Sequence, residues 1–447
     1  MIRYHARWVL PITSAPVRDG TVAVEGSRIA YVGPRADAPP GPDRELGRAI
    51  LLPGLVNAHT HLELTAFHDV IPARGFRDWI VTLQALKTAV MTRDFYRDSA
   101  RAGLADGLRA GITTYADTCD SGVAFEAMRE MGVRGIMYQE VFGPDPAQAE
   151  HSMHALEKKL DALAPMADDL RHLGVSPHAP FTVSDALFKR VVELRTPMAI
   201  HVAESAEETD LIKDGSGPFA DGLRARKIAV APRASSPIEL LDKLGVLRVR
   251  PLLIHCVRVD ARDIRAIAKQ NCPVAHCPRS NEMLGHGVAP LAALLDAGVH
   301  VGLGSDSMAS NERMDILGEA RLAASAQVAR GATMDVTRTL NLATVEGARA
   351  LGLSHRVGAL EVGKDADLAA FELDAPDDMI DGGPEAALAA HAPHRARATI
   401  VAGVEKVWDS ELVGADPSLP ERVRAITEAL RTDPELRRRS GGAARTS

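Results

Sequence analysis

Short apolar runs alternate with longer segments of helical periodicity through the middle of the chain. An apolar run of roughly four to eight residues between turn residues is typical of a buried strand, and strands that alternate with amphipathic helices predict parallel βαβ units. Eight such runs follow one another: GLVNAHTH (54–61), GITTYADT (111–118), VRGIMYQEVFG (133–143), HLGVSPHAP (172–180), PMAIHVAES (197–205), PLLIHCVRVD (251–260), CPVAHCPRS (272–280) and HVGLGSDS (300–307). Eight parallel strands close a (β/α)8, TIM-like barrel, so the pattern predicts an α/β fold of this kind.

The segments between these runs have the spacing of helices. Leu156, Leu160 and Leu163 recur at i, i+4 and i+7, and residues 260–271 form an amphipathic series that begins with an aspartate cap. The longest connection, residues 205–250, contains KDGSGP and APRASSP, whose Gly, Ser and Pro residues predict breaks between short helices. We expect this connection to form part of a rim over the carboxyl ends of the strands.

The two ends of the chain are both β-rich. TVAVEGSRIAYVG (21–33) predicts two strands joined around Glu25-Gly26-Ser27, and similar segments return at 357–374 and 396–409. Neither end has enough strands to be stable alone, so we expect the two to form one small β-sandwich domain. Two unrelated edge hairpins are the alternative.

These patterns divide the chain into four segments. Residues 1–52 and 356–412 are the expected parts of the β-sandwich, and residues 53–355 are the expected barrel. Residues 413–447 are expected to hold a helix within PERVRAITEALRTD (420–433), followed by the basic end RRRSGGAARTS. We expect that end to be solvated and frayed.

Composition and charge narrow the class of protein. Of the 447 residues, 46% are apolar and 25% are charged, which is close to the norm for a globular chain. The formal net charge of −7 leaves no basic excess for binding phosphates, so nucleic acid is not an expected partner. The N-terminus lacks a signal-length apolar core, and no run of about 18 apolar residues occurs, so we expect a cytoplasmic protein without membrane contact. No C-x-x-C pair occurs among the four cysteines, which are expected to be buried free thiols: Cys119, Cys256, Cys272 and Cys277.

Metal-ligating side chains stand at the ends of three predicted strands. His59 and His61 are two residues apart on one strand, so both point from the same face and can bind one ion together. His201 ends the fifth strand and Asp306 ends the eighth. Three or four protein ligands with one open position are typical of a catalytic metal site. Residues 172–180 contain no lysine that could bridge two metals, so we expect one divalent ion, zinc first and iron(II) as the alternative.

Two further polar residues follow predicted strands at the same end of the barrel. Asp306 would accept the proton of a water activated by the metal, and His255 would orient the resulting hydroxide or stabilise developing charge. Glu204, three residues after His201, would protonate a ring nitrogen while water adds to the neighbouring carbon. The alternatives are a buried structural imidazole for His255 and a loop carboxylate for Glu204.

Candidate substrate-binding residues surround this set. Glu63 should project to the same face as His61, and His178 ends the fourth strand, where it would contact a ribose or a ring. Phe76 and Trp79 follow the first strand and would stack on a base, with core packing as the competing account. Three more polar residues receive no chemical role: His276 and Asn281, which we expect to be scaffolding, and His286, to which we assign nothing.

Five motifs in this order and spacing make the chain resemble the amidohydrolase superfamily, in its deaminase and chlorohydrolase branch. They are NAHTHLELT (57–65), SPHAPFTVS (176–184), HVAESAEE (201–208), HCPRSN (276–281) and GLGSDSMASNE (302–312). The resemblance covers nearly the whole chain, including the split β domain. It implies His59, His61, His201 and Asp306 as metal ligands, and Glu204, His255 and Asp306 as catalytic residues.

The same resemblance implies hydrolysis of an amino group on a heterocycle. The sequence is most similar to aminodeoxyfutalosine deaminases, through FRDWI (76–80) and DGSGPF (214–219), which would place the reaction in menaquinone biosynthesis. The alternatives are deaminases of adenosine, methylthioadenosine, S-adenosylhomocysteine or guanine, a chlorohydrolase-like enzyme, and a non-catalytic scaffold with the same fold. The expected partner is a small molecule, and a homodimer remains open.

Overall fold

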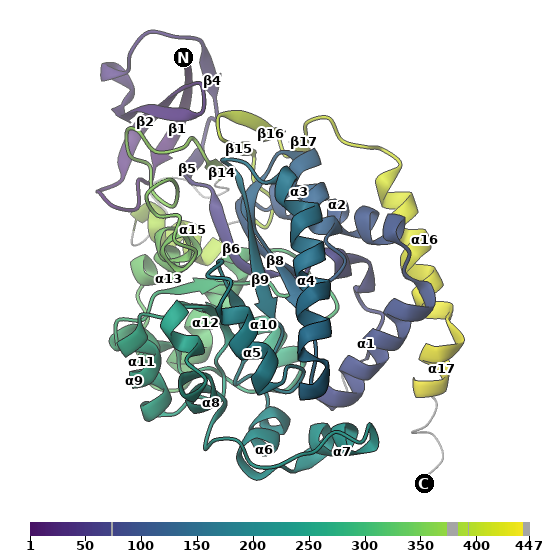
Figure 1. The fold of residues 1–447 in the computed structure, drawn as a ribbon. Helices are drawn as coiled ribbons and strands as arrows, with labels where there is room; N and C mark the ends of the chain where they lie inside the picture. The colour runs from purple at the N-terminus through teal and green to yellow at the C-terminus, as the bar shows by residue number, and fades with distance from the viewer. Residues whose placement is uncertain (73–74, 373–382, 392, 441–447) are drawn as a thin grey trace.

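The computed structural model describes the chain except residues 73–74, 373–382, 392 and 441–447. Its centre is a ring of parallel strands, enclosed by helices in Figure 1. All eight predicted strands are confirmed: β6 (Leu55–Thr60), β7 (Ile112–Cys119), β8 (Arg134–Val141), β9 (Arg171–Pro177), β10 (Ala199–Val202), β11 (Leu252–His255), β12 (Val274–His276) and β13 (Val301–Leu303).

The strands form two parallel four-stranded sheets, β6-β7-β8-β9 and β10-β11-β12-β13. Isolated bridges join the two sheets, one between Val175 and Met198 and one between Thr60 and Asp306. Both bridges are parallel, so they close the two sheets into the predicted barrel. Most strand residues are buried on both faces, which explains why the strands appear in the sequence as nearly continuous apolar runs.

Helices cover the outside of the barrel and connect its strands. Their bounds are α1 (Phe76–Val90), α2 (Arg93–Arg109), α3 (Val123–Met131), α4 (Ala149–Leu163), α5 (Asp185–Val192), α6 (Ala206–Asp214), α7 (Gly217–Ala225), α8 (Pro237–Lys243), α9 (Ala261–Gln270), α10 (Pro278–Met283), α11 (Leu291–Asp296), α12 (Ile316–Ala329), α13 (Val336–Ala343) and α14 (Val345–Ala350). The predicted helices at 156–163 and 260–271 are therefore confirmed, the second with a capping box formed by Asp260 and Asp263. The long connection 205–250 contains α6, α7 and α8, as its helix breaks predicted.

The two ends of the chain meet in one β domain. Its strands are β1 (Ile2–Val9), β2 (Val17–Glu25), β3 (Arg28–Pro34), β4 (Asp43–Glu45), β5 (Ala49–Pro53), β14 (Leu368–Glu372), β15 (Ala398–Val401), β16 (Val404–Trp408) and β17 (Glu411–Leu412). The strands follow the order β17-β16-β15-β14-β5-β1-β2-β3, and β4 pairs with β1. The antiparallel pair β5–β14 joins the two ends, so they are not unrelated hairpins.

A buried ion-pair cluster links the β domain to the barrel. Arg134, at the start of β8, lies 2.8 Å from Asp365 and 2.9 Å from Asp367, and all three side chains are 1% exposed. Two carboxylates around one guanidinium satisfy its donors in a fixed geometry. The cluster therefore fixes the segment just before β14 against the barrel.

The C-terminal segment packs beside the mouth of the barrel. Helices α16 (Leu419–Thr432) and α17 (Pro434–Ser440) lie next to α1, as Figure 1 shows in yellow and blue. Leu436 is buried in an apolar cluster that also contains Phe76 and Trp79. The expected frayed tail was therefore wrong for its first residues, because α17 continues to Ser440; residues 441–447 lie outside the described part.

Two more observations concern the whole described chain. All four cysteines are buried and free, as the sequence predicted. Within the described residues, no helix has both the length and the apolar character that a membrane span requires.

Candidate active site

A cavity of about 820 Å³ lies at the carboxyl ends of the barrel strands. Polar residues that follow five different strands line it: His61, His178, His201, Glu204, His255 and Asp306. Its opposite wall is apolar and comes largely from α1, including Phe76, Trp79, Ile80 and Leu83. The mouth of a (β/α)8 barrel is where such enzymes hold their chemistry, so this cavity is the candidate active site.

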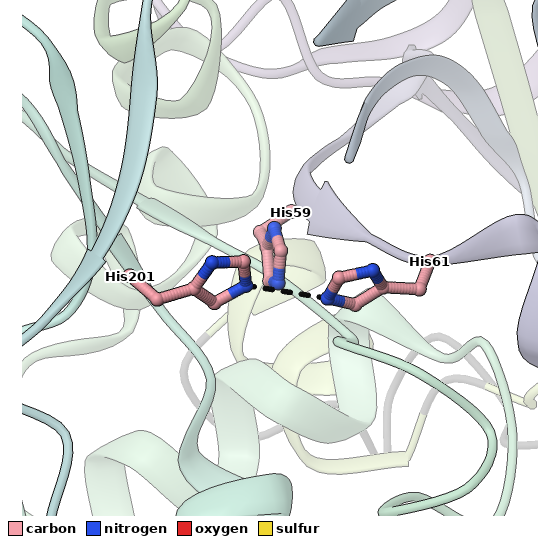
Figure 2. Close-up of side chains that lie close together, drawn as sticks. All are labelled: His59, His61 and His201. Atoms are coloured by element: carbon pink, nitrogen blue, oxygen red, sulfur yellow. Dashed lines mark hydrogen bonds between the residues drawn. The ribbon is translucent and has the colours of Figure 1, made fainter. Parts of the chain in front are cut away.

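Three histidines converge at the base of this cavity. Figure 2 shows His59 and His61, from the end of β6, facing His201 from β10. The Nε2 atoms of His61 and His201 are 3.2 Å apart. His201 Nδ1 lies 3.1 Å from the backbone oxygen of His178, and His61 Nδ1 lies 3.1 Å from the hydroxyl of Thr118. The carbonyl contact directs His201 Nε2 toward His61, whereas the Thr118 hydroxyl also lies 3.3 Å from His61 Nε2 and so contacts the His61 ring without selecting one nitrogen.

Asp306, which follows β13 next to β6, completes the group. Its Oδ1 lies 3.4 Å from His59 Nε2 and 3.7 Å from His61 Nε2. Its Oδ2 accepts hydrogen bonds from Ser280 at 2.5 Å and Ser310 at 3.3 Å. Burial opposes ionisation of Asp306, but the contact with His59 and the surrounding imidazoles hold its pKa well below the usual range. Its Oδ1 also accepts a hydrogen bond from the backbone N–H of Ser307 at 2.7 Å, so both oxygens are anchored while Oδ1 faces the histidines.

The four side chains fit a divalent metal ion. His59 Nε2 is buried and has no hydrogen-bond partner among the described residues, which is costly unless another group occupies the position it faces. Zinc–nitrogen bonds of about 2.0–2.1 Å in a tetrahedron separate neighbouring ligands by roughly 3.3 Å. The observed 3.2 Å and 3.4 Å separations agree with that spacing. Burial also lowers the pKa of His59, His61 and His201, which favours the neutral imidazole that binds metal.

Glu204 and His255 lie next to this group and contact each other. Glu204 is buried just after β10, and its Oε1 lies 3.5 Å from His255 Nε2. Asn281 Oδ1 lies 2.9 Å from His255 Nδ1, so the ring donates from Nδ1 and presents Nε2 to the cavity. Asn281 therefore has the supporting role that its sequence position suggested.

His286 is the site residue that sequence reasoning missed. Its Nε2 lies 3.2 Å from Glu204 Oε1, and its ring packs edge-on against Phe76 at 4.5 Å. Burial opposes ionisation of Glu204, but His255 and His286 more than offset it and lower the pKa of Glu204. No periodic pattern marks His286, because it stands on a loop between Gly285 and Gly287, both with positive φ.

Of the residues that the sequence suggested for substrate binding, some line the cavity and one does not. Trp79 and His178 both line the cavity, and Phe76 lies beside Trp79 on α1. Glu63 corrects the expectation: β6 ends at Thr60, and Glu63 stands in the 3-10 helix η2 (Leu62–Phe67), so strand alternation does not apply to it. Its buried carboxylate turns away from the cavity and bonds Ser121, Cys119 and Lys87.

Two more cavity residues were not singled out from the sequence. Lys87 from α1 and Glu140 from β8 both line the cavity. Glu140 could have been found, because it stands near the carboxyl end of a predicted barrel strand, as His201 and Asp306 do. Lys87 could not, because a lysine on an amphipathic helix normally faces solvent.

A closed parallel barrel with histidines and an aspartate gathered at its strand ends defines the class of metal-dependent hydrolases. Residues 50–406 match the sequence model of the Amidohydrolase family. The chain belongs to this family, and it is a hydrolytic enzyme.

Relatives with known names agree with this assignment. The chain is 31% identical over 389 residues to the 5-methylthioadenosine/S-adenosylhomocysteine deaminase of Moorella thermoacetica, covering 82% of this chain and 85% of that protein. It is similar to the crystal structure of a zinc-bound adenosine deaminase from Xanthomonas campestris, with a TM-score of 0.84, 29% identity and coverage of 97% and 99% of the two chains. The aminofutalosine deaminase of Helicobacter pylori shares the fold, with a TM-score of 0.78, 19% identity and coverage of 91% of this chain and 100% of that one.

Proposed function

We propose that this enzyme removes the amino group from an adenine-type nucleoside by hydrolysis, releasing ammonia, with one divalent ion, zinc first, held by His59, His61, His201 and Asp306. One observation carries the proposal: a buried carboxylate, Glu204, lies beside the four candidate ligands and faces the same cavity. A hydrolase that uses only an activated water does not need a second buried acid at this point, whereas loss of an amine requires a proton donor.

A bound divalent ion would supply Lewis acidity that makes a water molecule nucleophilic near neutral pH. Asp306 accepts a proton from that water while the water oxygen attacks the carbon that bears the amino group. Glu204 donates a proton to the adjacent ring nitrogen, and the proton held by Asp306 then leaves with the amine as ammonia. Both water protons are accounted for, one on the ring nitrogen and one on ammonia.

Two neighbours keep these groups in place. His255, fixed by Asn281, presents Nε2 to the cavity, where it orients the attacking water by accepting a hydrogen bond from it. His286 holds the Glu204 carboxylate through its 3.2 Å contact. Because the lowered pKa leaves Glu204 ionised at neutral pH, it first takes a proton from water and then passes it to the ring.

Two groups of nucleosides are candidates for the substrate. The motifs that resemble aminodeoxyfutalosine deaminases favour 6-amino-6-deoxyfutalosine. The names of the curated relatives favour 5-methylthioadenosine or S-adenosylhomocysteine. All contain the adenine ring and differ in the 5′ substituent, so the site chemistry is the same for each.

The test is ammonia release from a panel of adenine nucleosides, with guanine and a chlorinated triazine added. Enzyme loaded with zinc or iron(II) should turn over at least one adenine nucleoside, and the same protein stripped with a chelator should not. Turnover confined to guanine or to the triazine would refute the proposal. A protein that retains no stoichiometric metal and turns over nothing would instead be a non-catalytic scaffold.

A further inference from the structure

A second polar region lines the cavity on the side of strands β7, β8 and β9. Glu204, His255 and Asp306 follow β10, β11 and β13, on the other half of the barrel. The second region consists of Lys87, Asp120, Glu140, His178 and Thr182. The reaction described above does not use its charged members. An adenine ring at the metal ligands would leave the rest of a roughly 820 Å³ cavity, large for a ligand site, to a substituent that reaches this region.

Lys87 is a fixed charge in this region. Its ammonium lies 3.3 Å from Glu63, and the two side chains are 11% and 1% exposed. Glu63 is itself held by the backbone N–H of Ser121 at 3.2 Å and by the thiol of Cys119 at 3.0 Å. An ammonium has three N–H donors, and among the described residues the recorded acceptor is Glu63, with the ring face of Tyr96 at 5.9 Å. Donors therefore remain for a ligand.

The burial of this pair has a cost that packing does not explain. Removing an ammonium and a carboxylate from water is costly, and an apolar pair of similar size is often at least as stable. Glu63 fixes the position of Lys87 from behind, while the lysine side chain contributes to the cavity wall. A preorganised charge that borders a binding cavity is the arrangement expected for recognition of an ion of opposite sign.

Glu140 is the second buried ionisable group of this region, and unlike Lys87 it has no ion-pair partner at hydrogen-bond distance among the described residues. Its side chain is 4% exposed, and its Oε1 has no hydrogen-bond partner among the described residues. That oxygen lies 4.0 Å from His178 Nε2, on the same cavity wall. Burial raises the pKa of Glu140 to about 8, so at neutral pH the group is an uncharged acid with an O–H to donate.

We propose that Lys87 and Glu140 form a subsite for a carboxylate in the 5′ substituent of the substrate. The inference rests on the proposed function and narrows it to adenine nucleosides whose 5′ chain ends in a carboxylate. A carboxylate offers two acceptor oxygens, one for the lysine ammonium and one for the Glu140 hydroxyl. Methylthioadenosine and adenosine lack this group and would leave both donors unpaired.

The charges nearby favour a carboxylate over a phosphate. Lys87 is the buried cation of this region, and Glu63 already balances it. Asp120 also lines the wall, with its charge matched by Lys159 at 2.9 Å. A phosphate dianion usually needs several cations or a cluster of backbone N–H groups, whereas one ammonium and one acid suit a monoanion.

The test compares 6-amino-6-deoxyfutalosine with its methyl ester, which lacks the charge of the tail and carries one added methyl group. For the metal-loaded wild type, kcat/KM for the acid should exceed that for the ester by about 10- to 100-fold, the contribution of a charge-assisted contact. In Lys87→Met/Glu63→Gln, which strands no buried charge, this ratio should fall to within about threefold of one. Lys87→Arg should keep most of the preference, and Lys158→Met, which removes an exposed lysine of α4, should keep all of it. S-adenosylhomocysteine, methylthioadenosine and adenosine 5′-monophosphate complete the panel.

Each outcome decides between the alternatives. An acid-to-ester ratio near one in the wild type, or a ratio that the double variant leaves unchanged, overturns the subsite while the deaminase function stands. A preference for the 5′-monophosphate over both carboxylates also overturns it. If no nucleoside is turned over, calorimetric titration with the two nucleosides separates the questions. If the wild type binds the acid more tightly than the ester and the double variant does not, the subsite is supported although the proposed function fails. If the wild type binds both nucleosides equally well, the subsite is overturned.

Discussion

The contact between His286 and Glu204 allows a sharp test of the mechanism. The change is His286→Asn, alone and combined with Glu204→Gln. His286 Nε2 lies 3.2 Å from the Glu204 carboxylate, and both side chains are buried. His286 Nε2 has no recorded hydrogen-bond partner among the described residues, so this electrostatic contact contributes at most as much as a hydrogen bond to a charged group, about 1.5–3 kcal/mol. Because about 1.36 kcal/mol corresponds to a tenfold change in rate, losing the contact should lower kcat by at most about 150-fold.

The double variant shows how His286 acts. Glu204→Gln alone should lower kcat by about 10²–10⁴, the usual contribution of a positioned acid or base. If His286 acts only by orienting Glu204, adding His286→Asn to Glu204→Gln should cost no more than about threefold. Single and double variants are compared by steady-state ammonia release at full metal occupancy, with metal content measured for each. Glu282→Ala, an exposed change on the same segment, is the matched control and should keep wild-type kcat.

Two results would refute this reasoning. Additive losses in the double variant would show that His286 contributes independently of Glu204. A rise in KM with kcat unchanged would show that His286 helps to bind substrate and does not position the acid.

Three further predictions concern the metal, pH and stability. His59→Ala and His201→Ala should each lower bound metal well below one ion per chain and abolish turnover; full occupancy by elemental analysis with an unchanged rate would mean that the site is misplaced. Because the pKa of Glu140 rises from 4.5 to about 8 on folding, its contribution to stability is complete below pH 4.5 and is lost as pH rises to about 8. Denaturant titrations should therefore show wild type losing more stability than Glu140→Gln between pH 5 and about pH 8, and parallel curves would contradict the shift. Arg134→Met should lower the free energy of unfolding by about 3–5 kcal/mol, because it leaves the buried Asp367 carboxylate without its guanidinium partner, while Asp365 keeps Arg28 and Arg356, and a loss under about 1 kcal/mol would show that the cluster is solvated.

The barrel and the convergence of the four candidate metal ligands could be predicted because their signals are local. Eight apolar runs of strand length separated by helical segments allow few arrangements other than a closed parallel barrel. His59 stands on β6 and His61 is the first residue after that strand, so the two-residue period of the strand was enough to bring the two side chains together. His201 and Asp306 could be added because the carboxyl ends of all barrel strands meet at one mouth, whatever the lengths of the helices between them.

Residues on loops and helices could not be placed in this way. Glu63 was expected to share the face of His61, but the chain leaves β6 after Thr60 and turns into η2, so alternation no longer determines its direction. Lys87 lines the cavity and pairs with Glu63, which stands 24 positions earlier in the chain. A sequence pattern cannot show such a pair, because each partner alone resembles an ordinary surface charge.

The sequence by itself determined the secondary structure, the closed barrel and the strand ends on which the four candidate metal ligands stand, because each depends on periodicity within one element. Only the tertiary structure decided which groups face Glu204 and which line the rest of the cavity. His286 reaches Glu204 from a glycine-flanked loop, and the C-terminal helix α17 packs Leu436 into the same apolar cluster as Phe76 and Trp79. These contacts join segments far apart in the chain, and their geometry exists only after the barrel has closed and its helices have packed.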